Sequence, residues 1–138
     1  MGAIYANLKL MNADEEGAVR LGLLKEDSVH TLDVKALVDT GADMMTVPDH
    51  VTNQLNLPVI EYREFKLADG SAKKLPVVGP VSVEFANRRT ICYVVSTLDD
   101  EVLLGSIPME DLDVVLNPRR QTMEINPESP YLPTTRLK

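Results

Sequence analysis

The sequence has very few of the residues on which several classes of protein depend. It contains one cysteine, no tryptophan, two phenylalanines and four tyrosines among 138 residues. A single cysteine, Cys92, excludes an internal disulfide framework and any metal site built from several cysteines. The only histidines, His30 and His50, are too far apart in the sequence to form the metal-binding pair of a single helix. We therefore expect neither a metal nor another cofactor.

Positive charge is also scarce. Lysine and arginine total 14 against 21 aspartates and glutamates, which gives a formal net charge of −7. Such a balance argues against a nucleic-acid partner or an anionic membrane surface, because both carry phosphates that an acidic protein repels. The chain also lacks a long apolar run and the pattern of a secretory signal. We expect a cytoplasmic protein with no nucleic-acid and no membrane partner.

The residues that are present are those of an ordinary folded domain. Hydrophobic residues make up 44% of the chain and charged residues 25%. A chain of 138 residues is about the size of one domain. We expect a single domain over residues 1–138, in which the proline-containing segment 126–138 is an irregular tail.

Short apolar stretches separated by turn-forming residues recur along the whole chain, which predicts a mainly β fold. Two short helices are expected, one within 48–57 and one over 108–112. In each segment a proline stands where the first helical turn begins, and in the first the apolar residues also follow at near-helical spacing. The segment 12–17 is expected to be a polar turn, and 25–28 a hairpin turn. The expected strands are 4–11, 19–24, 30–38, 64–67, 74–85, 90–96, 114–116 and 122–125.

The segment that carries chemistry follows the strand at 30–38. Its alternating pattern predicts a strand with one buried face, and it leads directly into Asp39-Thr40-Gly41-Ala42. A glycine at the third position lets backbone N–H groups turn towards the carboxylate. If a second carboxylate of the same kind were brought to about 3 Å from that of Asp39, the two could not both ionise and would share one proton. The aspartic proteases use this arrangement. One carboxylate then activates a water and the other protonates the peptide carbonyl.

The surrounding sequence resembles the retropepsin-like aspartic proteases, which include the retroviral proteases and their single-domain relatives. The resemblance begins with residues 36–42 and the short helix that ends near Leu55-Asn56-Leu57. It continues through Leu67-Ala68-Asp69-Gly70-Ser71, which resembles the tip of the flap hairpin that covers the cleft in that family. Further on, Leu103-Leu104-Gly105 resembles the element that packs behind the catalytic loop. The resemblance therefore implies a closed β-barrel with one or two short helices.

The resemblance also implies a role for each residue of these motifs. Asp39, Thr40 and Gly41 would form the catalytic motif. The substrate-binding residues would be Ala42, Asp43, Ala68, Asp69, Gly70 and Ser71. Since the sequence contains one Asp-Thr-Gly, a mechanism with two aspartates requires a homodimer in which each copy supplies one Asp39. The implied activity is that of an aspartic endopeptidase acting on an extended peptide or protein.

Two features depart from the pattern of the retroviral enzymes. Ser106 follows Gly105 where those enzymes carry an arginine that braces the dimer, and Gly70 is the only glycine at the tip of the expected flap. Two alternatives therefore stay open. One is a catalytically silent dimer of the same fold that binds peptides or proteins, and the other is a monomeric β domain in which Asp-Thr-Gly is incidental.

Other reactive residues are interpreted structurally. Asp99-Asp100-Glu101 has no second acidic cluster at metal-ligand spacing, so a solvated turn is the simplest interpretation. Gly105-Ser106 lacks the flanking residues of a nucleophile elbow. Cys92 has apolar neighbours and is expected to be a buried, unreactive thiol. The pairs Arg88-Arg89 and Arg119-Arg120 are expected to be solvated charges at turns.

Overall fold

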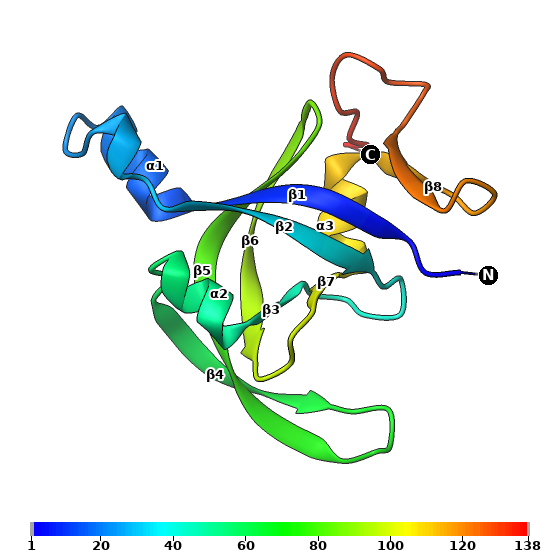
Figure 1. Cartoon of the computed structure of the whole chain (residues 1–138), viewed down its shortest axis with the longest axis horizontal. Coiled ribbons are helices and arrows are strands. Elements are labelled where there is room, and N and C mark those ends of the chain that lie inside the picture. Colours follow the sequence, from blue (N-terminus) through cyan, green and yellow to red (C-terminus); the bar gives the residue numbers. More distant parts are fainter. Residues whose placement is uncertain (1, 138) are drawn as a thin grey trace.

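The computed structural model describes residues 2–137, which form a closed β-barrel with a few short helices (Figure 1). The elements are β1 (Tyr5–Asn12), α1 (Ala13–Arg20), a 3-10 turn η1 (Glu26–Ser28), β2 (Thr31–Val38), β3 (Thr46–Pro48), α2 (Asp49–Gln54), β4 (Val59–Lys66), β5 (Ala72–Phe85), β6 (Arg88–Thr97), β7 (Val102–Leu104), α3 (Ser106–Leu112), β8 (Val114–Asn117) and β9 (Thr122–Ile125).

Six strands close the barrel in the order β1-β2-β7-β3-β6-β5, and pairing of β1 with β5 completes the ring. β4 extends the sheet beyond β5, so that β4 and the first part of β5 form a hairpin that stands away from the barrel (Figure 1). β8 and β9 form a separate two-stranded sheet. The expected fold class, a mainly β closed barrel with short helices, is confirmed.

The core follows from the alternation of apolar residues along the strands. In β1, Leu8 and Leu10 point inward while Lys9 between them is exposed. Val81 and Val83 of β5 do the same from the neighbouring strand. Because side chains alternate between the two faces of a strand, this pattern fills the barrel from all its strands at once.

One expected strand does not form, because α1 and the turn that follows it occupy its residues. Residues 13–20 form α1, so the expected polar turn at 12–17 and the expected strand at 19–24 are both wrong. The side chain of Asn12 caps the helix by accepting a hydrogen bond from the N–H of Glu15 at 3.0 Å. Acidic residues fill the first turn and Arg20 stands in the last, which is the charge order that a helix dipole favours.

The expectation that Arg88 is a solvated charge is also wrong, because the residue is 1% exposed. It stands at the start of β6, and the tail that follows β9 covers it. Its Nη2 donates to the carbonyl oxygen of Ser129 and lies 3.9 Å from a carboxylate oxygen of Asp113. The physical reason is a long-range contact: the chain returns from residue 129 to bury a hairpin end that local sequence marks as exposed.

The described residues include no helix long and apolar enough to cross a membrane.

Candidate active site

The Asp39 loop begins where two neighbouring strands fix its position. β2 pairs in parallel with β7, and Val38 lies opposite Leu104. The N–H of Asp39 donates to the carbonyl oxygen of Leu104 at 3.0 Å, and the N–H of Val38 donates to that of Ile4 at 2.8 Å. The backbone on which the Asp39 carboxylate is carried is therefore held from two sides of the barrel.

Within the loop, the backbone turns around the carboxylate. The N–H of Gly41 donates to Oδ1 of Asp39 at 3.0 Å, and the N–H of Ala42 donates to the carbonyl oxygen of Asp39 at 3.2 Å. Asp39 and Ala42 are half-buried, whereas Thr40, Gly41 and Asp43 are exposed. Only Oδ1 has a hydrogen-bond partner among residues 2–137, so Oδ2 is available to a ligand.

The start of α3 holds the other end of the loop. The N–H groups of Ser106 and Ile107 donate to the carbonyl oxygens of Ala42 and Asp43 at 2.8 and 3.1 Å. Gly105, directly before α3, is buried, and a side-chain carbon there would lie against the carbonyl oxygens of Met44 and Asp43, 2.6 Å from that of Asp43. A glycine is needed at this position because the two backbones approach so closely. The segment Leu103–Gly105 thus packs behind the loop.

Residues 68–71 form the tip of the β4–β5 hairpin. The N–H of Leu67 donates to the carbonyl oxygen of Ser71 at 2.8 Å, and Gly70 adopts a φ of +86°, which favours glycine. The carboxylate of Asp69 accepts from the hydroxyl and the N–H of Ser71, and these bonds lower the pKa of Asp69. Asp69 therefore rigidifies the turn as a hydrogen-bond acceptor within it.

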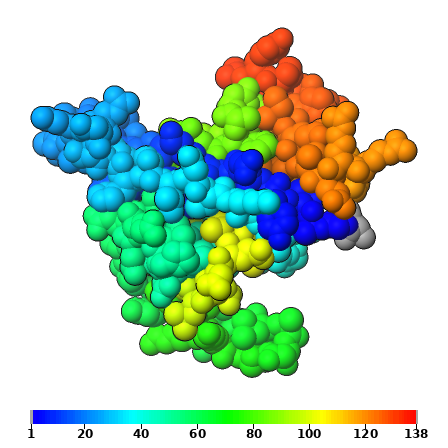
Figure 2. All heavy atoms as spheres, in the orientation of Figure 1, coloured from blue at the N-terminus to red at the C-terminus, as the bar shows by residue number. Residues whose placement is uncertain are grey.

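The structure gathers residues 39–43 into one loop and places residues 68–71 at the end of a separate arm. Among the described residues, no hydrogen bond joins the two groups. Figure 2 shows a hollow between the hairpin, in green, and the body of the barrel. The arrangement is that of an open cleft, with the Asp39 loop on the barrel side and the hairpin tip on the other.

A groove beside the Asp39 loop was not predicted from the sequence. It has a volume of about 570 Å³, and its lining includes Met44, Ile60, Tyr93 and Ile107. These residues belong to four elements or loops that are far apart in the chain, so no local pattern could have indicated the groove. Its lining is mainly apolar, which suits an apolar side chain.

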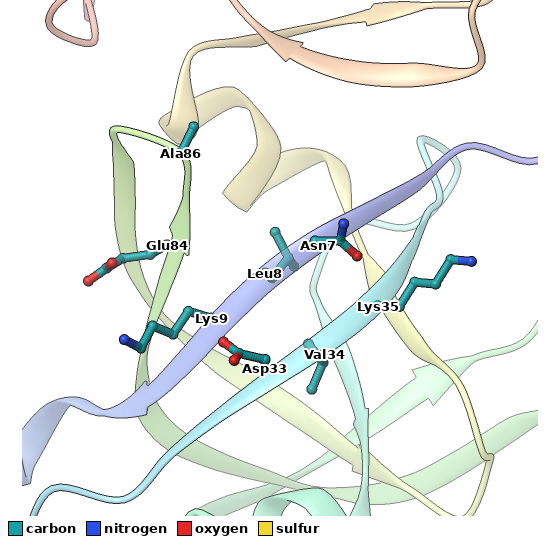
Figure 3. A pocket seen from close by; sticks show the side chains of 8 residues that line it. All are labelled: Asn7, Leu8, Lys9, Asp33, Val34, Lys35, Glu84 and Ala86. Carbon is teal, nitrogen blue, oxygen red and sulfur yellow. The ribbon is translucent and has the colours of Figure 1, made fainter.

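A depression on the outside of β1, β2 and β5 has a different character (Figure 3). Lys9 and Lys35 line it together with Asp33 and Glu84, so the charges of these four side chains cancel. Its lining contains no residue of the Asp39 loop. It offers no preference for a charged ligand and takes no part in the candidate site.

The remaining candidates carry no reactive feature. Burial, and to a lesser degree the charge of Asp111, raises the pKa of the Cys92 thiol to about 11. A thiol with a raised pKa is a poor nucleophile at neutral pH. Residues 2–137 contain no group of three or more His, Cys, Asp or Glu side chains positioned to hold a metal ion.

A closed barrel of this topology, with an Asp-Thr-Gly loop at the end of β2 and a hairpin over the cleft, defines the retropepsin-like aspartic proteases. The family described as gag-polyprotein putative aspartyl protease matches residues 28–123, and the chain belongs to this family. The matched region begins before β2 and includes the Asp39 loop, the hairpin and α3. A search of curated proteins finds no match.

Proposed function

We propose that this protein is an aspartic endopeptidase whose active site is formed by two copies of the chain. The observation that carries the proposal is the Asp39 loop. It presents one half-buried carboxylate, held by the N–H of Gly41, at the edge of a cleft. The chain contains one Asp-Thr-Gly, so a pair of such carboxylates needs two chains.

In the proposed mechanism, the two Asp39 carboxylates share one proton and hold a water molecule between them. The ionised carboxylate acts as base and removes a proton from the water as it attacks the peptide carbonyl. The protonated carboxyl donates to the carbonyl oxygen and stabilises the tetrahedral intermediate. No covalent bond forms between enzyme and substrate, and proton transfer to the amine completes the cleavage.

The other residues of the site bind and orient the substrate. Thr40 contacts the second copy across the pair of loops, and Gly41 offers its backbone to the peptide. Ala42 and Asp43 bind the substrate next to the carboxylates. The hairpin tip at residues 68–71 closes over an extended peptide by strand-like hydrogen bonds. The groove lined by Met44 and Ile107 receives an apolar side chain of the peptide.

The experiment that tests this function compares Asp39→Asn with Asp33→Asn. Each variant removes one carboxylate. Asp33 lies within β2 and is exposed on the outside of the barrel, whereas Asp39 directly follows β2. Hydrolysis of a denatured protein mixture should fall by about 10²–10⁴-fold in Asp39→Asn, because general acid–base catalysis contributes about that factor. It should be unchanged in Asp33→Asn.

An inhibitor that mimics the tetrahedral intermediate should abolish the activity of the unaltered protein. Cleavage that persists undiminished in Asp39→Asn would contradict the proposal. Tight binding of peptides without any product, in the unaltered protein, would point instead to a catalytically silent binding module of the same fold.

A further inference from the structure

A hollow between β6 and α3 has no part in the proposed function. Its volume is about 480 Å³. Its lining consists of residues 90–92 of β6, residues 134–136 of the tail that follows β9, and four residues of α3, namely Ile107, Pro108, Glu110 and Asp111. We call it the outer hollow. The tail lies outside residues 28–123, which the family model matches, so part of this lining comes from beyond the matched region.

The tail is fixed in the place where it lines the hollow. The carboxylate of Asp113 accepts hydrogen bonds from Nδ2 of Asn126 at 2.9 Å, from the hydroxyl of Ser129 at 2.5 Å and from the N–H of Thr134 at 2.8 Å. Asp113 directly follows α3, so these bonds hold the tail beside that helix. Figure 1 shows the end of the tail, in red, next to α3.

The outer hollow adjoins the apolar groove beside the Asp39 loop. Cys92, Ile107 and Pro108 line both. On the outward face of β6, Ile91 lines the outer hollow and Tyr93 lines the groove, and both are about half exposed. Side chains two positions apart in a strand share a face, so these two form a continuous apolar strip. A peptide with one side chain in the groove can therefore continue along this strip into the outer hollow.

The outer hollow combines exposed apolar side chains with charge. Ile91 and Ile107 are 57% and 60% exposed, which is unusual for isoleucine. Glu110 and Asp111 add two carboxylates and Arg136 adds one guanidinium, so the lining carries a net charge of −1. Among residues 2–137, none of these three charged side chains forms an ion pair. The carboxylates of the hollow are therefore free to meet a positive charge from a ligand.

We infer that the outer hollow binds a lysine or arginine side chain of the substrate, at a position beyond the apolar residue that fills the groove. The inference rests on the proposed function, which places a peptide side chain in that groove. Lysine and arginine lay an apolar stem along apolar surface while the charged end reaches polar groups. Here the stem lies on Ile91 and Ile107, and the charged end reaches Glu110 and Asp111. The net charge of −7 on the chain acts in the same direction, because it attracts cationic peptides.

The two-fold symmetry of the proposed dimer extends the inference to both ends of the peptide. Each copy of the chain contributes one outer hollow, so one lies towards each end of the bound substrate. The substrates are then proteins with an extended segment in which apolar residues flank the cleaved bond and basic residues follow further out on both sides.

The test reverses the charges of the outer hollow and identifies by mass spectrometry where a denatured protein mixture is cut. The unaltered protein should cut at sites enriched in lysine and arginine beyond the apolar residue. Glu110→Lys combined with Asp111→Lys should replace this preference with one for aspartate and glutamate, whereas Arg136→Glu should strengthen it. For two peptides that differ only by lysine or glutamate at this position, the ratio of kcat/KM should change by about two- to fivefold for each reversed charge, because exposed ion pairs are weak.

Glu26→Lys combined with Asp27→Lys is the matched control. Both residues are exposed on η1 and line neither the groove nor the outer hollow, and the substitutions change the net charge by the same amount. The control should keep the preference for basic residues. With a peptide that ends at the apolar residue, the two double variants should have equal kcat/KM, which also shows that the variant of the hollow is folded.

The outcomes separate this inference from the proposed function. Cleavage without a basic preference, or a preference that the control shifts as much as the variant of the hollow, would overturn the inference and leave the proposed function intact. An acidic preference that Arg136→Glu abolishes would overturn it as well. Binding of the two matched peptides, measured by fluorescence anisotropy, tests the hollow without cleavage. A protein that cleaves nothing but binds the lysine peptide more tightly through Glu110 and Asp111 would support the hollow and contradict the proposed function, and equal binding of both peptides would overturn the inference.

Discussion

Gly105→Ala tests whether the close contact between α3 and the Asp39 loop determines activity. The backbone of Gly105 is extended, with φ −82° and ψ 176°, so alanine adopts it without strain. The added carbon would lie closest to the carbonyl oxygen of Met44 and 2.6 Å from the carbonyl oxygen of Asp43, whereas ordinary contact begins at 3.4 Å. The loop must therefore retreat by about 1 Å.

This displacement has two expected consequences. Overpacking of a buried position lowers the free energy of unfolding by about 1–3 kcal/mol. A misplacement of about 1 Å at reacting groups costs roughly 10²-fold in rate, so we expect kcat/KM to fall by about that factor. Denaturation by urea measures the first effect and peptide hydrolysis, at a temperature where the variant is folded, measures the second.

Gly17→Ala provides the control for the added methyl group. Gly17 lies in α1, and a side-chain carbon there would meet only Nη2 of Arg20 at the ordinary distance of 3.5 Å. We expect this variant to gain about 0.5–1 kcal/mol, because alanine favours a helix over glycine. A Gly105→Ala variant that matches the unaltered protein in both stability and activity would refute the reasoning about the loop.

Two further predictions concern titratable groups. Hydrogen bonds from Ser129, Asn126 and Thr134 lower the pKa of Asp113 to about 2 in the folded protein. The stability that the ionised Asp113 carboxylate contributes is thus complete above pH 4 and is lost as the pH falls towards 2. The free energies of unfolding of Asp113→Asn and of the unaltered protein should therefore converge on acidification. A difference that stays constant with pH would contradict this. Burial raises the pKa of the Cys92 thiol to about 11, so little reactive thiolate is present at pH 8. Cys92 should therefore react with iodoacetamide at pH 8 roughly 10²-fold more slowly in the native chain than in the unfolded chain. Equal rates would contradict the burial of the thiol.

The parts of the site that were predictable from the sequence have local signals. The alternation along β2 and the sequence Asp39-Thr40-Gly41 lie within one short segment, and so does the Asp69-Gly70 turn of the hairpin. Such signals depend on residues that are neighbours in the chain. They suffice for a mainly β fold and for the location of the Asp39 loop, whereas the closed barrel was implied by the resemblance of these motifs to the retropepsin-like aspartic proteases.

The helix α1 had a local signal that was outweighed by another. Asn12 followed by Glu15 is typical of a helix N-terminus, and three acidic residues fill the first turn. However, Asp, Glu and Gly residues are also common in polar turns. In the next segment, from Val19 to Leu24, apolar residues occupy every second position, which is typical of a strand. Composition therefore predicts a turn and a strand, whereas the order of charges, acidic in the first turn with Arg20 in the last, predicts the helix that forms.

Arg88 and the apolar groove had no local signal. Arg88 is buried by a contact with Ser129, which is 41 positions away in the chain. The groove is assembled by Met44, Tyr93 and Ile107 from separate parts of the barrel. Features of this kind follow from the tertiary fold, so a single sequence read by local pattern does not reveal them.

The most direct test of a shared active site is the activity of mixed dimers. Unaltered protein and Asp39→Asn are combined at a fixed total concentration, unfolded and refolded together, and assayed for peptide hydrolysis. If each site needs Asp39 from both copies, activity follows the square of the unaltered fraction, and an equal mixture retains about one quarter. If each chain works alone, activity is proportional to that fraction, and an equal mixture that retains one half would contradict the account.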